Sequence, residues 1–532
     1  MNDAPSPSGP QLTVPSAGPS VPPEAITDPA KLGAEAVARL LADPTAAAGW
    51  LAQQLAMLNR APLAVPARQA LAVAVESPIA TLRDVAQSYS STLGPAAQLE
   101  RREFFDAMAR LATEHAYAWK LTLTDAMGAV SPTAREEPAS LANALRALEL
   151  EALLAYSLYR SLAHRTWREA IEIARLAATL GCIDRPMTIS DNDGVPTEQT
   201  VGRLFQRLLL THLLLPQRLP RGGVWLAHRY LGRHGALSEF VPARREAAGE
   251  FHLSVDLDGP MPRVISAEMP QELASPRTRH LRLTGLFNRV REEYAELEEG
   301  RQPPGLDDVP LELARQVLKG MLVAWYLRPP RQAKRELAAG WLNAVVGFEQ
   351  IAGRQGVEGT GEATAPAATQ ARCFQLDQSS NGVALEFRSP WSTAVQIGQL
   401  LQLQRKDSDL LAMPERFVAV IRRFVQRPGD VLMAGLQRLP GRPLPVDLRD
   451  PNDRLPPRRG LLLRRSGASR LVLLAPPGSY RQHAELAISG AEGDLVALAD
   501  KLLERTEFFD RIEMSIAERL PASLPPTVLA AG

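Results

Sequence analysis

The sequence predicts a multidomain α+β protein, in which a large region of helical hairpins precedes a small β-barrel and a second small β-rich unit. Three observations lead to this prediction. The chain has 532 residues, a length typical of about three or four domains. Apolar residues recur at helical spacing through most of residues 30–327. From about residue 336 the pattern changes to short apolar runs separated by turn residues, which is typical of strands.

Residues 1–29 are predicted to be a disordered tail. They are rich in Pro and Ser and contain too few apolar residues to bury a core. They also lack the basic stretch and apolar stretch of a secretory signal. No window of the chain holds 18 apolar residues, and the nearest candidate, LFQRLLLTHLLL, is interrupted by Gln206, Arg207 and His212. We therefore expect no membrane span and a cytoplasmic protein.

Residues 30–327 are predicted to be mainly helical. In SLANALRALELEALLAYSLYRSL, apolar residues spaced by three and four share one helical face. They are Leu141, Leu145, Leu148, Ala152, Tyr159 and Leu162. The stretch WREAIEIARLAATLG continues this pattern, and Gly181 is expected to end that helix. These helices, separated by breaks, resemble stacked hairpins, although we find no repeat of fixed length.

A short β-hairpin is predicted inside this helical region, near residues 249–266. There the pattern changes to alternation, with a turn at Asp258-Gly259. Helical spacing then returns at residues 283–298 and again at 310–327.

Residues 328–440 are predicted to form a small β-barrel. The candidate strands are LAAGWLNAVVGF, NGVALEF, GQLLQLQ, ERFVAVIRRFVQ and DVLMAGLQRL. The Gly-, Ala- and Thr-rich stretch GRQGVEGTGEATAPAATQ is predicted to be a flexible insertion within this region.

Residues 441–532 are predicted to form a small C-terminal β/α unit, beginning with a Pro-rich link over residues 440–460. GLLLRRSGASRLVLLAPPG predicts a hairpin, and HAELAIS and DRIEMSIAE predict two further strands. A short helix is expected near residues 495–505.

Composition narrows the classes of function. The formal net charge of +1 by itself predicts no strongly charged partner. However, residues 415–470 contain thirteen Arg, no Lys and five Asp or Glu, a net charge of +8. The two cysteines, Cys182 and Cys373, are far apart in the sequence and lie in no metal-binding motif, which favours a reducing compartment and no structural zinc. No metal or other cofactor is expected.

Two short segments have residue types suited to a nucleotide. LRPPRQAKREL contains Arg331 and Arg335, with Arg328 as a further candidate, and the fork of guanidinium donors grips phosphate and stacks on bases. LDQSSNGVALEF contains Asp377, Ser379 and Gly382. A carboxylate can accept the N–H donors of guanine, a hydroxyl can bond to phosphate or base, and glycine allows a tight turn and close approach.

The order of these segments before and within a β region resembles the PilZ domain, a six-stranded barrel that binds cyclic di-GMP. That family has Arg-x-x-x-Arg before the first strand and Asp/Asn-x-Ser-x-x-Gly after the second strand begins. The resemblance covers about residues 330–440 and implies that Arg331 and Arg335 clamp guanine and phosphate. It also implies that Asp377 and Ser379 hold a guanine edge or phosphate beside Gly382. The long gap between Arg335 and Asp377, and the residues Gly340 and Trp341, depart from the family pattern.

The resemblance implies a bacterial, non-enzymatic receptor in signal transduction, with cyclic di-GMP as its ligand. The chain has no GGDEF-, EAL- or HD-GYP-type signature, so it resembles a reader of the dinucleotide rather than its maker or destroyer. The large helical region is expected to pass the binding event to a protein partner.

Two alternatives stay open. The first is a scaffold or chaperone-like protein, in which the helical hairpins bind a partner and the PilZ-like barrel no longer binds nucleotide. The second, less favoured, is nucleic-acid binding through the Arg-rich surface of residues 415–470.

Overall fold

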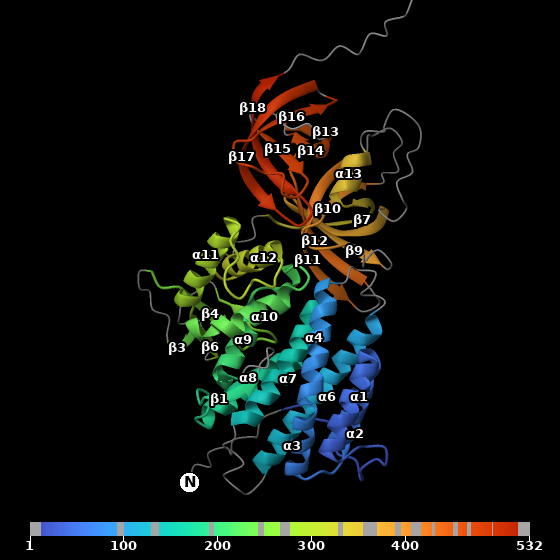
Figure 1. The fold of residues 1–532 in the computed structure, drawn as a ribbon, viewed down its shortest axis with the longest axis vertical. Helices are drawn as coiled ribbons and strands as arrows, with labels where there is room; N and C mark the ends of the chain where they lie inside the picture. The colour runs from blue at the N-terminus through green and yellow to red at the C-terminus, as the bar shows by residue number, and fades with distance from the viewer. Residues whose placement is uncertain are drawn as a thin grey trace, which may run out of the picture. The chain divides into compact units, whose positions relative to one another are not determined.

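The structure is a computed structural model and describes fourteen stretches of the chain. They are residues 12–92, 101–128, 138–190, 196–242, 249–265, 277–327, 333–354, 370–388, 395–405, 416–427, 431–450, 456–464, 470–491 and 493–519. The chain divides into two compact units, Met1–Arg328 and Pro329–Gly532. The first unit is mainly helical and the second is built of β-strands, which confirms the predicted α+β class (Figure 1).

The first unit contains eleven α-helices in its described residues. They are α1 (Pro29–Ala42), α2 (Pro44–Arg60), α3 (Val65–Ala74), α4 (Glu76–Thr92), α6 (Arg102–Gly128), α7 (Pro138–Ser157), α8 (His164–Thr179), α9 (Val201–Leu213), α10 (Gly223–His234), α11 (Thr284–Glu298) and α12 (Leu311–Leu322). A π-helical turn, η5 (Val323–Leu327), follows α12.

Local sequence explains why neighbouring helices start where they do. The carboxylate of Asp43 accepts a hydrogen bond from the backbone N–H of Thr45 at 2.8 Å, which caps α2. Pro44 occupies the first turn, where its missing N–H has no helical partner to lose. Helix α12 has Pro310 at its N-cap position, and the nearby carboxylate of Asp308 forms an ion pair with Arg229.

One apolar core runs through the helical unit. The long helix α6 packs against both α2 and α7, and large side chains such as Phe104, Trp119 and Trp167 are fully buried among them. Helix α7 is buried on most of its surface, which matches its nearly continuous run of Leu and Ala.

Two small sheets lie within the helical unit. Strands β1 (Met187–Ser190) and β2 (Pro196–Gln199) pair antiparallel. The second sheet has the order β3-β6-β4-β5 and is formed by β3 (Glu239–Val241), β4 (His252–Asp256), β5 (Arg263–Val264) and β6 (Thr278–Arg282). Val255 of β4 pairs with Val264 of β5, so a β-hairpin lies in the stretch where alternation occurs in the sequence.

The N-terminal segment of residues 12–28 makes specific contacts, whereas disorder was expected there. The backbone N–H of Thr13 donates to the buried carboxylate of Glu169 at 2.9 Å. Further along, the N–H of Ile26 donates to the side-chain oxygen of Gln54, and the Gln54 amide returns a bond to the Glu24 carbonyl. Side chains on the helices therefore provide hydrogen-bond partners for backbone groups of this short Pro-rich segment, which has no regular structure to pair them.

Ion pairs are buried inside the helical bundle. Lys120 contacts Glu169 at 2.8 Å, and both side chains are almost fully buried. The carboxylate of Glu149 accepts two bonds from Arg207 and contacts His228 at 2.8 Å. Removing one partner of such a pair leaves an uncompensated charge, so these groups tie their helices into one arrangement.

The second unit begins with a closed six-stranded barrel of order β10-β11-β12-β9-β8-β7. Its strands are β7 (Glu336–Val346), β8 (Gln370–Ser379), β9 (Gly382–Arg388), β10 (Leu400–Arg405), β11 (Arg416–Arg427) and β12 (Val431–Arg438). Five of the six lie where the sequence predicts strands. The sequence patterns do not predict β8 or the short helix α13 (Phe348–Arg354), which flank the predicted insertion.

A second closed barrel follows, of order β13-β14-β15-β18-β17-β16. Its strands are β13 (Arg442–Arg449), β14 (Arg458–Arg464), β15 (Leu471–Ala475), β16 (Glu485–Gly490), β17 (Gly493–Arg505) and β18 (Asp510–Arg519). The predicted β-rich C-terminal unit is thus confirmed. Counted along the chain, both barrels have the same order, first-second-third-sixth-fifth-fourth.

Two predictions in this barrel are wrong. The short helix expected near residues 495–505 is strand β17, which pairs with β16 and β18 along its length. The Pro-rich link expected over 440–460 contains strand β13. Strand β16 pairs only with Val446–Arg449, so the part of β13 with the two prolines has a ladder partner on one side only.

The two barrels share a buried apolar interface. Outward-facing Leu400, Val418 and Val420 of the first barrel belong to the same core cluster as Leu461, Leu463 and Leu474 of the second. Phe509, at 0% exposure, belongs to this cluster as well. Beside it, the guanidinium of Arg422 forms an ion pair with Glu504 across the two barrels. The β unit is therefore held together by both packing and charge.

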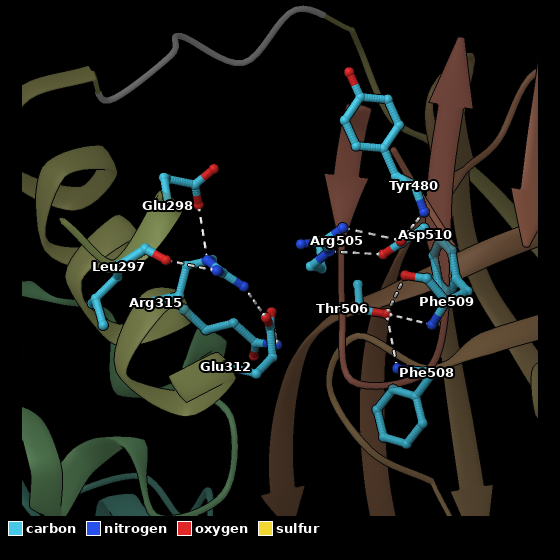
Figure 2. Close-up of polar contacts among 11 residues, drawn as sticks. Leu297, Glu298, Glu312, Arg315, Tyr480, Arg505, Thr506, Phe508, Phe509 and Asp510 are labelled. Atoms are coloured by element: carbon cyan, nitrogen blue, oxygen red, sulfur yellow. Dashed lines mark hydrogen bonds and ion pairs between the residues drawn. The ribbon is translucent and has the colours of Figure 1, made fainter. Parts of the chain in front are cut away.

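A network of hydrogen bonds closes the hairpin between β17 and β18 (Figure 2). The hydroxyl of Thr506 accepts from the N–H groups of Phe508 and Phe509 at 3.1 and 3.0 Å. Fully buried Asp510 accepts from Arg505 and from the backbone N–H of Tyr480. The turn that presents Phe509 is thus fixed by side chains on both of its strands.

Figure 2 also shows how α11 and α12 are joined within the helical unit. The guanidinium of Arg315 donates to the Leu297 carbonyl at 2.7 Å and to Glu312 at 2.6 Å, and it contacts Glu298 at 3.0 Å. Two of its three partners, Leu297 and Glu298, lie at the end of α11, so one arginine links the two helices.

Over the described ranges, no helix is long and apolar enough to cross a membrane. The same ranges contain no group of three or more His, Cys, Asp or Glu side chains that could hold a metal ion.

Candidate functional site

The candidate site lies at the hairpin that joins β8 and β9. Ser379 and Gly382 pair directly across this hairpin, with Ser380 and Asn381 at its tip. A bulge in β8 lies between Gln375 and Asp377 in the pairing with β9. The pairing of β8 with β7 is irregular at the same level, between Leu337 and Gly340 of β7. Bulges redirect side chains, and this one places Asp377 opposite Leu337, close to the start of β7.

Arg335 and Asp377, which are 42 residues apart in the sequence, form an ion pair. The guanidinium Nη1 donates to Asp377 Oδ2 at 2.8 Å, and the two side chains are 31% and 23% exposed. The structure therefore brings one predicted arginine and the predicted carboxylate together at the edge of the first barrel.

The other oxygen of this carboxylate, Asp377 Oδ1, is buried and has no hydrogen-bond partner in the described part of the chain. A buried charged oxygen without a donor is costly, so such an atom marks a place where a donor is needed. The N–H groups of a guanine edge or of a further arginine would meet that need.

Ser379 and Gly382 lie at the base of this hairpin. The hydroxyl of Ser379 is 3.5 Å from the Gly382 carbonyl, at the limit of a hydrogen bond, so it remains available to another partner. Gly382 does not adopt a positive φ. Instead, a Cβ at this position would lie 3.0 Å from the Leu436 carbonyl oxygen of β12. Close strand packing, rather than a tight turn, accounts for the glycine.

The remaining predicted residues, Arg331 and Arg328, lie outside the described residues. Lys334 and Arg335 are described and precede β7 directly. The structure thus places the end of the Arg-x-x-x-Arg segment beside the hairpin.

A hollow of about 320 Å³, which the sequence does not predict, lies next to Ser379. Its polar wall is formed by Lys334, Glu336, Gln375, Gln378, Ser379 and Ser380, and its other walls by Leu342, Val383, Phe417 and Arg438. The guanidinium of Arg438 lies over the Phe417 ring, 4.4 Å from its centroid. These residues come from five different segments, and no sequence pattern links them.

An exposed aromatic group also belongs to the first barrel. Trp341 is 44% exposed and pairs across the strands with Phe374, their ring centroids 5.3 Å apart. The guanidinium of Arg372 lies 4.5 Å from the Trp341 ring centroid, and Leu337 is 94% exposed. Trp341 departs from the PilZ pattern, and its exposure explains how the barrel tolerates so large a side chain.

A larger hollow, about 610 Å³, lies in the helical unit. Charged residues such as Arg203 and Asp184 lie at its edge, while Phe205 and Phe240 contribute apolar surface. None of the predicted site residues lines it, so size alone does not identify the nucleotide site.

Comparison with known proteins gives one family. Residues 34–243 match the family described as "Cyclic-di-GMP receptor FimW, N-terminal domain". The match covers less than half of the chain and lies within the helical unit. It does not include the candidate site. The chain is therefore similar to this family over its N-terminal helices.

No curated protein matches the chain. Among solved structures, one described as "Structure of Bacillus subtilis Inhibitor of motility (MotI/DgrA)" matches at 12% sequence identity. The match covers 35% of this chain and 90% of that chain, with a TM-score of 0.12. At this TM-score the likeness supports no statement about the fold or function of the present chain.

Proposed function

We propose that the protein is a non-enzymatic receptor for cyclic di-GMP and that the dinucleotide binds to a PilZ-like first barrel. Arg331 and Arg335 hold phosphate and stack on guanine. Asp377 and Ser379 form hydrogen bonds with the guanine edge or with phosphate. Gly382 keeps the β8–β9 hairpin packed against β12.

The observation that carries this proposal is that two separate segments indicate the same ligand. Residues 34–243 are similar to a family described as the N-terminal domain of a cyclic-di-GMP receptor. Residues 330–440, which lie outside that match, have the two motif halves of a PilZ barrel and fold into a closed six-stranded barrel. Neither indication depends on the other.

The geometry at the hairpin supports the choice of residues. Arg335 already contacts Asp377 at 2.8 Å, so the two halves of the motif lie within reach of one ligand. The buried Asp377 Oδ1 needs a donor, and guanine has two adjacent donor groups, N1–H and N2–H₂.

We further propose that binding is passed to a protein partner through the helical unit. Arg331 lies in the short stretch between η5, which ends at Leu327, and β7, which begins at Glu336. A ligand held by this stretch can shift a conformational equilibrium only by contacting two states differently. The resemblance suggests outputs such as motility, pili, adhesion or exopolysaccharide.

Isothermal titration calorimetry tests the receptor function. The full chain is titrated with cyclic di-GMP as the wild type and as Arg331→Ala/Arg335→Ala. Each charge-assisted contact is worth about 1.5–3 kcal/mol, so the double variant should show no binding at micromolar ligand.

The matched control is Arg442→Ala/Arg458→Ala, which removes the same charge from exposed positions on the second barrel. It should bind like the wild type. A wild type that gives no heat at several temperatures contradicts the proposal. Binding to an oligonucleotide that falls steeply with salt and changes little with cyclic di-GMP would instead favour nucleic-acid binding by the Arg-rich surface.

A further inference from the structure

The hollow beside Ser379 has the size and the polar groups of a base-binding pocket. Its volume of about 320 Å³ falls within the range of small-molecule sites and is too small for a whole cyclic dinucleotide. It therefore fits one guanylate half of the ligand. This inference rests on the proposed function and extends it to a second part of the barrel.

The hollow and the Arg335–Asp377 pair lie on opposite faces of the same strands. Asp377 and Gln378 are consecutive residues of β8, so their side chains point to opposite faces of the sheet. On β7, Leu337 opposite Asp377 is 94% exposed, and on β9, Val383 opposite Gln378 is buried. Lys334 and Glu336, which flank Arg335 in the sequence, line the hollow, whereas Arg335 itself does not. The mouth of the barrel and its outer surface thus meet at Ser379.

The polar groups of the hollow match the edge of a guanine. The carboxylate of Glu336 can accept from N1–H and N2–H₂, the two donors that distinguish guanine from adenine. The side-chain amide of Gln375 donates to the side-chain oxygen of Gln378 at 3.0 Å, which fixes the orientation of the Gln378 amide. The N–H groups of Gln378 are then left to donate to O6 of guanine. Adenine would present an acceptor to Glu336 and a donor to Gln378, both unfavourable.

The remaining walls fit the rest of a nucleotide. Phe417, with Arg438 stacked over its ring, offers an aromatic and cationic surface at the mouth of the hollow. Lys334 is exposed, and its ammonium group forms no ion pair with any described residue. Its charge is suited to a phosphate oxygen of the same nucleotide.

We infer that the mouth of the first barrel is a guanine subsite, in which Glu336 and Gln378 read the base and Lys334 binds the adjoining phosphate. Cyclic di-GMP then straddles the β8–β9 hairpin, with one half on the outer surface at Arg335 and Asp377 and the other half in the mouth.

The test compares three probes, cyclic di-GMP, cyclic di-AMP and GMP, in calorimetry on the full chain. Glu336→Gln should reduce the preference for cyclic di-GMP over cyclic di-AMP by about tenfold, since it removes an acceptor that only guanine satisfies. Lys334→Gln should weaken cyclic di-GMP about five- to tenfold. The control Lys501→Gln removes the same charge from an exposed position on β17 of the second barrel and should change nothing.

Asp377→Ala separates this inference from the proposed function. If Asp377→Ala loses binding while Glu336→Gln and Lys334→Gln match the wild type, the subsite is overturned and the receptor function stands. If the wild type binds GMP but not cyclic di-GMP, and Glu336→Gln weakens GMP, the subsite stands and the proposed function fails. If the wild type binds none of the three probes, both are overturned.

Discussion

At the scale of single residues, Gly382 shows how one atom can set the position of the site. A Cβ added there would approach the Leu436 carbonyl oxygen to 3.0 Å, a contact that backbone atoms relieve only by moving a strand. The packing of β9 against β12 therefore requires glycine at position 382. Because β9 is one strand of the hairpin that presents Asp377 and Ser379, the position of that hairpin depends on Gly382 as well.

We predict that Gly382→Ala lowers the free energy of unfolding by about 1–2 kcal/mol, because the methyl group forces β9 away from β12. Urea unfolding followed by circular dichroism measures the change. Gly340→Ala is the matched control, since a Cβ at that strand position meets no atom within 4 Å. Equal stability of the two variants would show that the crowding at Gly382 has no energetic consequence.

The half-buried carboxylate of Glu76 leads to a prediction about stability in acid. Burial by itself raises its pKa, but the neighbouring His115, Arg146 and Trp119 outweigh burial and lower the pKa from 4.5 to about 2. The contacts are close: His115 and the Trp119 indole nitrogen each lie 2.8 Å from Glu76 Oε1. In the unfolded chain the carboxyl keeps its ordinary pKa and binds a proton first as the pH falls.

Glu76 therefore stabilises the fold above about pH 5, and this contribution is lost as the pH falls from 4.5 towards 2. At pH 3 we expect a loss of about 1–2 kcal/mol from this group relative to pH 7. Urea unfolding at the two pH values measures it. Glu76→Gln, although less stable at pH 7, should lose less stability between pH 7 and pH 3 than the wild type, and an equal loss would contradict this assignment.

At the scale of elements, the barrel interface depends on a few apolar side chains presented by strand surfaces and turns. Phe509 is fully buried there, and its turn is fixed by Thr506 and by the Arg505–Asp510 pair (Figure 2). Because the second barrel also has a core cluster of its own, the interface can be weakened without emptying that barrel.

We predict that Phe509→Ala costs about 3–5 kcal/mol in the unfolding of the β unit, the usual range for removing a buried phenyl ring. The loss should appear as separate transitions of the two barrels in a thermal scan of the protein. Phe508→Ala, which removes a partly buried ring from the same turn, should cost less. A single, unshifted transition for Phe509→Ala would show that the interface adds nothing to stability.

The sequence predicts most strands of the barrels but fails where two signals conflict. Strand β17, GDLVALADKLLER, is rich in residues that favour helices and has apolar positions at helical spacing, so only pairing with β16 and β18 makes it a strand. Strand β13 contains two prolines, which predict a link and not a strand. In both cases the deciding contacts are distant in sequence, and no local window contains them.

The same limit applies to the candidate site. Motif order alone predicts that Arg335 and Asp377 belong together, and the structure pairs them at 2.8 Å. The mouth of the barrel could not be predicted, because Phe417 and Arg438 reach it from strands whose register is set by barrel closure. The bulge at Gln375–Asp377, which separates the two faces, has no signature in the sequence either.

At the scale of the whole molecule, the proposed coupling between the two units has a thermodynamic signature. If binding to the first barrel changes an equilibrium that involves the helical unit, the helical unit must in turn change the affinity of the barrel for its ligand. The effect is reciprocal and independent of the path between them.

We therefore predict that the fragment Pro329–Gly532 binds cyclic di-GMP with an affinity that differs from that of the full chain by about fivefold or more, corresponding to a coupling of at least about 1 kcal/mol. Calorimetry on both proteins, with circular dichroism as a check on the folding of the fragment, measures the difference. Equal affinities would leave the receptor function intact and contradict coupling through the helical unit.

The identical strand order of the two barrels bears on the ancestry of the chain. Two adjacent barrels with one topology are what the duplication of a single coding segment would leave behind. Arg438, at the end of β12, and Arg442, at the start of β13, repeat the arginine spacing. However, the link between β14 and β15 reads RRSGAS, without the aspartate and the glycine at their motif offsets. After such a duplication, selection for the ligand has to act on one copy only. Relatives of this protein should then preserve the hairpin of the first copy, while the hairpin of the second drifts.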